Sequence, residues 1–118
     1  MLIEFVKPDF VFESEAGCLS QLVHSGYKQI NSIISYKDST RGGHYHKYNK
    51  ELFYVIHGSF KLIVWKNDIK EEYKIKKNDM FIIPSYVYHS FEYFEDTILI
   101  GMYDNGIELD NNVKDIWK

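Results

Sequence analysis

The chain is poor in cysteine, with Cys18 the only one among its 118 residues, so no internal disulfide can form. A single cysteine is typical of a reducing compartment or of a protein that needs no cross-links, and we expect a small buried apolar side chain rather than a nucleophile. No apolar run approaches the length of a membrane span. The segment Met1–Phe5 has neither the basic nor the long apolar part of a signal peptide. We therefore expect a cytoplasmic protein with no membrane partner.

Arginine is equally scarce, because Arg41 stands alone beside thirteen lysines. The formal net charge is −3 and the lysines are intermixed with acidic residues, so the chain lacks the basic face that binding to nucleic acid requires. A guanidinium binds phosphate through a bidentate fork that an ammonium cannot form. Arg41 therefore has two interpretations: a phosphate ligand, or a surface residue that persists by chance in a lysine-rich composition.

The sequence has no stretch longer than about three turns in which apolar residues recur with the period of a helix. It also has no internal repeat, low-complexity tract or linker. Hydrophobic residues make up 45% and aromatic residues 17% of the chain, which permits a real core and favours strands. Short β-like segments recur at roughly 8–12 residue intervals between turn residues. The clearest predicted strands are 2–6, 29–36, 51–56, 60–66 and 97–103. This pattern predicts one all-β domain spanning 1–118, a sandwich or a barrel.

What the chain does contain is a group of histidines with a glutamate. His44 and His46 are two residues apart, and in a strand such residues project to the same face. Glu51 follows, and His89 comes five residues after Pro84. If the chain folds back on itself, three imidazoles and one carboxylate surround a point suited to Zn, Mn, Fe, Ni or Co.

The histidine pair, Glu51 and Gly58 give the spacing His-x-His-x4-Glu-x6-Gly, which resembles the first motif of the cupin family. Asp79, Pro84 and His89 resemble the second motif more loosely. The resemblance implies a single-domain cupin, a double-stranded β-helix or jelly-roll barrel, over about 27–103. Asn and Tyr stand at two turn positions where the second motif usually has glycine, and Asn tolerates the left-handed conformation.

The run Arg41-Gly42-Gly43-His44-x-His46-Lys47 narrows the resemblance to cupins of bacterial surface-sugar synthesis. These include the dTDP-sugar 3,4-ketoisomerases and the cupin domain of capsular polysaccharide synthesis enzymes. The ketoisomerases of this family work without a metal and usually carry Gln where this chain has Glu51. The capsular cupin domain holds a zinc, and the complete set of four ligands here resembles that domain more.

The resemblance therefore implies an isomerase or epimerase that acts on a nucleotide-linked keto-sugar in surface polysaccharide biosynthesis, with a divalent metal in the barrel. The metal would polarise a carbonyl and stabilise an enediolate; without it, the histidines themselves would move the proton. The implied metal ligands are His44, His46, Glu51 and His89. The candidate catalytic residues are His44, His46 and Tyr36, and the candidate substrate-binding residues are Arg41, Tyr54 and Tyr103.

Two other functions are consistent with the same residues. One is a metal-dependent cupin enzyme, a dioxygenase or an isomerase, that acts on an unrelated small metabolite. The other is a non-catalytic cupin that binds a sugar or a metal. For any of these functions we expect a homodimer, because cupins of this kind pair and the N-terminal strand is free to add to a partner's sheet.

Overall fold

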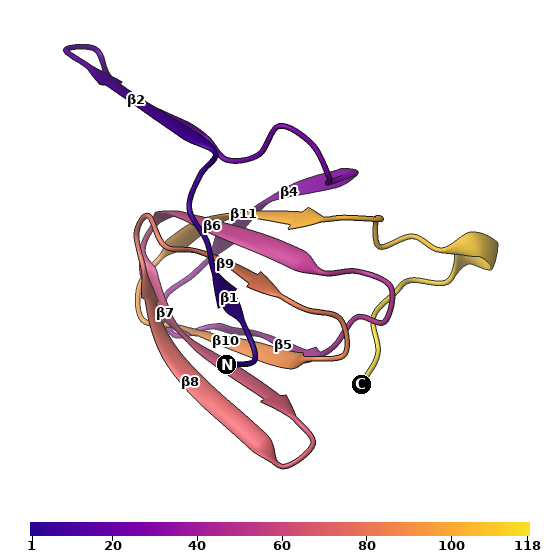
Figure 1. Cartoon of the computed structure of the whole chain (residues 1–118). Helices are drawn as coiled ribbons and strands as arrows, with labels where there is room; N and C mark the ends of the chain where they lie inside the picture. Colours follow the sequence, from indigo (N-terminus) through magenta and orange to yellow (C-terminus); the bar gives the residue numbers. More distant parts are fainter.

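The computed structural model describes all 118 residues, and almost every regular element in it is a β-strand (Figure 1). The strands are β1 (Glu4–Phe5), β2 (Phe10–Ser14), β3 (Gly17–Gln21), β4 (Gln29–Ser35), β5 (Thr40–His44), β6 (Glu51–His57), β7 (Ser59–Lys66), β8 (Ile69–Lys76), β9 (Met80–Ile83), β10 (Tyr88–Tyr93) and β11 (Thr97–Tyr103). One short 3-10 turn, η1 (Asp110–Asn112), lies near the C-terminus. None of the helical structure is long and apolar enough to cross a membrane. The all-β prediction is confirmed.

Two sheets face each other and form the barrel. The first has five strands in the order β1-β9-β6-β11-β4, and the second has four in the order β5-β10-β7-β8. Neighbouring strands are antiparallel throughout, and most come from distant parts of the chain, such as β11 between β6 and β4. This is the jelly-roll arrangement that the cupin resemblance implies.

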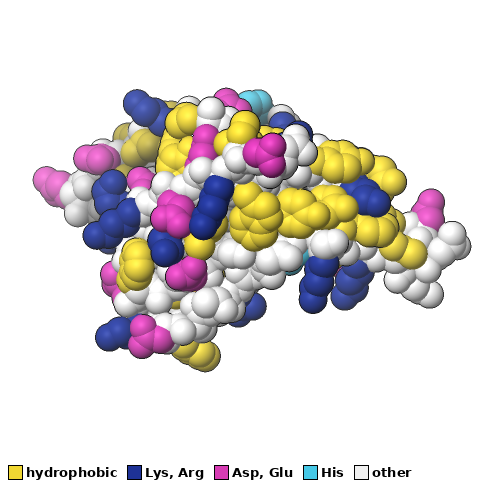
Figure 2. Space-filling view, turned by 90° about the horizontal axis from the view of Figure 1, so that it is seen from below, with side chains coloured by type: hydrophobic (Ala, Val, Ile, Leu, Met, Phe, Trp, Pro, Cys, Tyr) yellow, Lys and Arg dark blue, Asp and Glu magenta, His cyan; other side chains and the backbone are white.

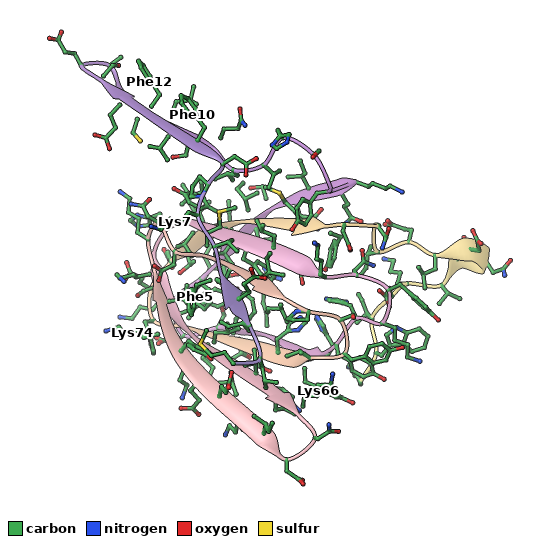
Figure 3. The ribbon with its side chains drawn as sticks, viewed as in Figure 1. Phe5, Lys7, Phe10, Phe12, Lys66 and Lys74 are labelled. Carbon is green, nitrogen blue, oxygen red and sulfur yellow. The ribbon has the colours of Figure 1, made fainter.

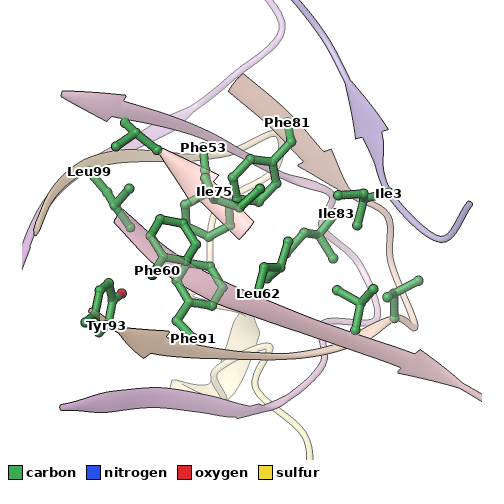
Figure 4. Close-up of a cluster of buried hydrophobic side chains, with 13 residues drawn as sticks. Ile3, Phe53, Phe60, Leu62, Ile75, Phe81, Ile83, Phe91, Tyr93 and Leu99 are labelled. Atoms are coloured by element: carbon green, nitrogen blue, oxygen red, sulfur yellow. The ribbon is translucent and has the colours of Figure 1, made fainter. Parts of the chain in front are cut away.

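The core fills the space between the two sheets (Figure 4). Its largest side chains are aromatic: the rings of Phe60 and Phe91 stack with their centroids 4.9 Å apart, and Phe53 stacks on Phe81 at 5.3 Å. Phe60, which is fully buried, alternates along β7 with side chains that reach the surface. The two-residue period of a half-buried strand therefore determines which side chains enter the barrel.

Two turns of the barrel contain a non-glycine residue with a positive φ angle. Asn78 and Tyr86 have φ of 73° and 67°, and they occupy the two positions where the second cupin motif usually has glycine. The left-handed conformation is favourable for Asn but costs energy for Tyr. The main-chain N–H of Tyr86 donates a 2.7 Å hydrogen bond to the carbonyl of His46, so this turn is tied to the histidine segment.

The outer face of the four-stranded sheet carries a row of aromatic rings. Trp65 and Tyr88 are directly opposite in the β7–β10 ladder and stack at 5.4 Å, and Tyr88 also contacts Tyr45 at 4.5 Å. Figure 2 views the molecule from below and shows a band of hydrophobic side chains among charged ones. Cross-strand aromatic pairs stabilise the pairing of two strands. Here they stabilise the pairing of β7 with β10, the strand that carries His89 on its inner face.

Candidate functional site

A cavity of about 120 Å³ opens between the two sheets at the histidine end of the barrel. Strand alternation places its lining, because residues two apart in β6 and β10 point into the barrel. The lining residues are Ile33, Arg41, Gly42, His44, Glu51, Phe53, His89, Phe91, Tyr93 and Tyr103. Polar groups therefore converge on a small space with an aromatic wall, the usual composition of a small-molecule site.

Two of the three histidines, His44 and His89, line this cavity, and His46 lies beside both of them. His44 ends β5 and lies opposite His89 in β10, and their ring centroids are 4.8 Å apart. The His46 ring lies 5.1 Å from each of them. The potential ligand atoms of all three fall within 4.8 Å of one another. His44 and His46 do not share a strand, because β5 ends at His44 and His46 lies beyond it.

Glu51 joins the histidines from the first position of β6. Its Oε1 lies 3.2 Å from Nε2 of His46 and 3.8 Å from Nε2 of His89. Burial raises the pKa of the Glu51 carboxyl, although the hydrogen bond and the charge of His46 act in the opposite direction. The structure therefore brings together the four side chains that the sequence singled out as ligands.

Main-chain carbonyls determine the tautomers of two of the histidines. Nδ1 of His46 is 2.7 Å from the carbonyl oxygen of Asp115, and Nδ1 of His89 is 3.1 Å from that of Val87. A carbonyl only accepts hydrogen bonds, so both Nδ1 atoms carry the hydrogen and donate it. Both Nε2 atoms are then directed at Glu51, the orientation found in metal sites and in proton relays.

The pKa values of the three imidazoles are shifted in different directions. Burial, with the neighbouring His46 and His44, lowers the pKa of His89 to about 3. Burial, His46 and Lys118 lower the pKa of His44. Burial also acts to lower the pKa of His46, but the hydrogen bond to Glu51 and its charge, together with the hydrogen bond to the Asp115 carbonyl and the Asp115 charge, outweigh it and raise the pKa. At neutral pH, His44 and His89 are therefore neutral, whereas the hydrogen-bonded pair of His46 and Glu51 retains a proton more readily.

The C-terminal segment fixes the loop that carries His46, a feature that the sequence did not indicate. The buried Asp115 carboxylate accepts hydrogen bonds from the main-chain N–H groups of Lys47 and Tyr48, at 2.8 and 2.9 Å. It also accepts from Asn49 Nδ2 at 2.9 Å and from Trp117 Nε1 at 2.7 Å. No local pattern predicts this contact, because Asp115 is 69 residues from His46.

Arg41 lies at the edge of the cavity, as a phosphate ligand would. Its Nε donates to Ser35 Oγ at 2.7 Å, and its Nη2 donates to the carbonyl of Ile34 at 3.1 Å. These bonds use two of the five N–H donors of a guanidinium and hold its plane in place. The remaining donors are available to an anion at the mouth of the cavity.

The predicted tyrosines divide into two groups. Tyr103 lines the cavity, with its ring edge-on to His46 at 5.2 Å, and burial and Glu51 raise its pKa. Tyr36 and Tyr54 do not line the cavity. Tyr36 is 71% exposed, beyond the end of β4, and the Tyr54 hydroxyl donates to Asn78 Oδ1. Tyr54 alternates with Phe53, which points inward, so it must point outward.

Tyr93 is a site residue that the sequence reasoning missed. It is buried and lines the cavity, and its hydroxyl is the one buried side-chain polar atom without a well-formed hydrogen bond, although the Ser35 hydroxyl lies near enough to act on its pKa. Buried polar groups normally have partners, so this hydroxyl is available to a ligand. Alternation along β10 from His89 through Phe91 to Tyr93 was the signal that could have identified it.

The sequence profile of the cupin domain matches residues 34–99, whereas no curated protein matches the chain. Similar solved structures include WlaRB, a TDP-quinovose 3,4-ketoisomerase from Campylobacter jejuni (14% identity, 95% and 92% of the two chains covered, TM-score 0.80). A 3,4-ketoisomerase from Helicobacter canadensis is also similar (17% identity, 95% and 89% of the two chains covered, TM-score 0.80). The same holds for QdtA, a sugar 3,4-ketoisomerase from Thermoanaerobacterium thermosaccharolyticum in complex with TDP (19% identity, 87% and 80% covered, TM-score 0.76). The profile covers more than half of the chain, which therefore belongs to the cupin family.

Proposed function

We propose that this cupin isomerises a nucleotide-linked keto-sugar by moving a proton at the carbon next to the ketone. The observation that carries the proposal is the meeting, in one small cavity, of the His44 imidazole, whose pKa is lowered by burial, with the Tyr93 hydroxyl and with Glu51, which His46 contacts at 3.2 Å. An imidazole is a suitable base near neutral pH, and the carbon acid needs both a base and a proton donor. The three solved structures described above are sugar 3,4-ketoisomerases.

In the reaction that we propose, the His44 imidazole accepts the proton from the carbon next to the ketone. The electron pair of the broken C–H bond moves to the carbonyl oxygen and leaves an enediolate. The Tyr93 hydroxyl, which makes no well-formed hydrogen bond in the protein, donates a hydrogen bond to that oxygen. Return of the proton to the former carbonyl carbon, with transfer of the hydroxyl proton between the two oxygens, moves the ketone by one carbon.

Arg41 would bind the diphosphate of the substrate. It is the only arginine of the chain, it lines the cavity, and Ser35 and the Ile34 carbonyl hold its guanidinium in place. A fixed guanidinium loses little conformational entropy when it binds a phosphate in bidentate fashion. QdtA has been crystallised with TDP, a nucleoside diphosphate, which agrees with this class of ligand.

The same residues fit a divalent metal. His44, His46 and His89 present imidazole nitrogens within 4.8 Å of one another, and Glu51 adds a buried carboxylate oxygen. The carbonyls that accept from Nδ1 of His46 and His89 are the outer partners that orient imidazole ligands. A bound metal would act as a Lewis acid on the substrate carbonyl. His44 is then a ligand, and in the metal-free protein it is the base.

The test uses TDP-4-keto-6-deoxyglucose, a ligand found in a QdtA structure. The purified protein is incubated with it in D₂O, and NMR follows the position of the ketone and the deuterium that enters from the solvent. We expect both isomerisation and exchange, and we expect His44→Asn to slow them by about 10²- to 10⁴-fold. His57→Asn, which changes an exposed histidine far from the cavity lining, is the matched control.

Elemental analysis before and after chelation separates the two roles of His44. Full activity in metal-free protein assigns it as the base, and loss of activity that returns with added metal assigns it as a ligand. Absence of isomerisation with TDP- and UDP-keto-sugars in both the metal-free and metal-loaded protein would refute the proposed reaction. Activity on an unrelated metabolite would then favour another cupin enzyme.

A further inference from the structure

Gly101 differs from the other six glycines of the chain, each of which has a positive φ angle that favours glycine. Gly101 has no such angle, so its backbone is that of an ordinary strand residue. It lies in β11, between β4 and β6 in the wall of the barrel (Figure 3), where a glycine weakens a strand. The reason for a glycine at this position is therefore space rather than backbone conformation.

Gly101 faces the interior of the barrel. It is directly opposite Phe53 in the pairing of β11 with β6, and directly opposed residues share a face. Phe53 lines the cavity, and so does Tyr103, two residues farther along β11. Leu99, two residues earlier, is fully buried in the core (Figure 4). Gly101 therefore lies on the inner face of the strand, at the boundary between the core and the cavity.

The side chains nearest to the inner side of Gly101 belong to the cavity wall. A Cβ atom on residue 101 would lie 3.1 Å from Cδ1 of Ile33, 3.3 Å from Cε1 of Phe53 and 3.6 Å from Oε2 of Glu51. All three residues line the cavity. The first two distances are shorter than the optimal separation of about 3.5–4.0 Å between carbon atoms. Because Gly101 is part of the barrel wall, a methyl group there would displace Ile33 and Phe53 away from the wall, toward the cavity.

We propose that Gly101 is a specificity-determining residue, which sets the width of the cavity and thereby the size of the sugar that the cavity admits. The inference rests on the proposed function, because it takes the keto-sugar as the ligand that enters the cavity. The cavity measures only about 120 Å³, so even a small inward shift of two lining side chains reduces the room for a sugar ring. Arg41, which would bind the diphosphate, is not among the nearest neighbours of residue 101. The nucleotide should therefore bind equally well with or without a methyl group there.

Gly101→Ala tests the proposal with two substrates that carry the same nucleotide. One is TDP-4-keto-6-deoxyglucose, and the other is its analogue with hydrogen in place of the methyl group on C5 of the sugar. A narrower cavity penalises the larger sugar more, and one carbon in a close-fitting pocket changes kcat/KM by about 10- to 200-fold. We expect the ratio of kcat/KM for the larger to that for the smaller sugar to fall at least about 10-fold in the variant. The Kd for TDP in calorimetry should remain that of the wild type.

Two further changes serve as rescue and control. Ile33→Val removes the Cδ1 atom that the new methyl group approaches most closely, so the double variant Gly101→Ala/Ile33→Val should regain most of the wild-type ratio. Ile100→Val changes the neighbouring residue of β11, which projects to the other face of the sheet, and should leave the ratio unchanged. Circular dichroism verifies that each variant is folded. If Gly101→Ala does not fold, the double variant is compared with Ile33→Val, and the ratio should fall in the same direction.

The outcomes separate this inference from the proposed function. A wild-type protein that isomerises neither sugar would refute the proposed function and, with it, the role of Gly101. If the wild type is active, an unchanged ratio in Gly101→Ala, or a lowered ratio that the double variant does not recover, would overturn the inference alone. Weaker TDP binding by Gly101→Ala would also overturn it, because the glycine would then support the whole site rather than the selection of the sugar.

Discussion

Replacing Asp115 with alanine should destabilise the protein more than any other change outside the core. The carboxylate accepts from the main-chain N–H groups of Lys47 and Tyr48 and from the buried Asn49 amide. Trp117 Nε1 is its fourth donor, and its bond, like those of the two main-chain N–H groups, is only partly buried, so water can replace these three in part. Alanine leaves one N–H of the buried Asn49 amide without its acceptor.

The cost follows mainly from the Asn49 donor. A buried donor left unsatisfied costs about 1–3 kcal/mol, and the three partly buried bonds add about 1 kcal/mol in all, so we expect a loss of about 2–4 kcal/mol. Domains of this size are stable by only about 5–15 kcal/mol, so the loss is a large fraction of the total. Urea denaturation followed by circular dichroism measures it, with Asp110→Ala, an exposed aspartate of η1, as the control.

The loss should depend on pH in one direction. Burial acts to raise the pKa of Asp115, but the hydrogen bonds that it accepts outweigh this and lower the pKa below its ordinary value. A carboxyl with a lowered folded pKa contributes stability that is present above its unfolded pKa and is lost as the pH falls through the folded pKa. The difference between wild type and Asp115→Ala should therefore be constant from about pH 5 to 8 and shrink below about pH 4.

The same variant tests how His46 is held. The carbonyl of Asp115 accepts from Nδ1 of His46, so a loosened C-terminal segment should also reduce activity at temperatures where the variant is still folded. A destabilisation below about 1 kcal/mol would show that these hydrogen bonds contribute little beyond what water provides, and the reasoning would be refuted.

Three further changes test the site. Glu51→Gln removes the carboxylate that raises the pKa of His46, so an NMR titration should show a lower His46 pKa in the variant. An unchanged His46 pKa would contradict the effect that we assign to Glu51. Arg41→Ala should weaken TDP binding about 10- to 100-fold in calorimetry, whereas the control Lys37→Ala, which removes an exposed cation nearby, should not. Equal TDP affinities of Arg41→Ala and the wild type would show that Arg41 does not bind the diphosphate. Tyr93→Phe deletes a hydroxyl that makes no well-formed hydrogen bond in the protein, so the melting temperature should stay unchanged while kcat falls about 10- to 100-fold. An unchanged kcat would exclude the Tyr93 hydroxyl as the hydrogen-bond donor to the substrate oxygen.

Local periodicity explains which parts of the site could be predicted. Phe53 and Phe91 enter the barrel because strand alternation encodes the side from which each residue projects. The same rule places Tyr54 outside and Tyr93 inside, and both assignments were missed because the tyrosines were selected for their chemistry rather than for their phase along the strand. Tyr36 was selected for the same reason, although it continues the exposed side of β4.

The all-β architecture and the cupin family could be predicted from the sequence, and so could the meeting of His44, His46, Glu51 and His89 in a chain that folds back on itself. Those predictions depend on two-residue alternation and on a motif of fixed spacing, both written locally in the chain. Which nitrogen of His46 faces Glu51 follows only from the fold, because the acceptor for the other nitrogen is the carbonyl of Asp115, 69 residues away. The fold also gives the three imidazoles different pKa shifts, because burial and the distance to a carboxylate are properties of the folded barrel.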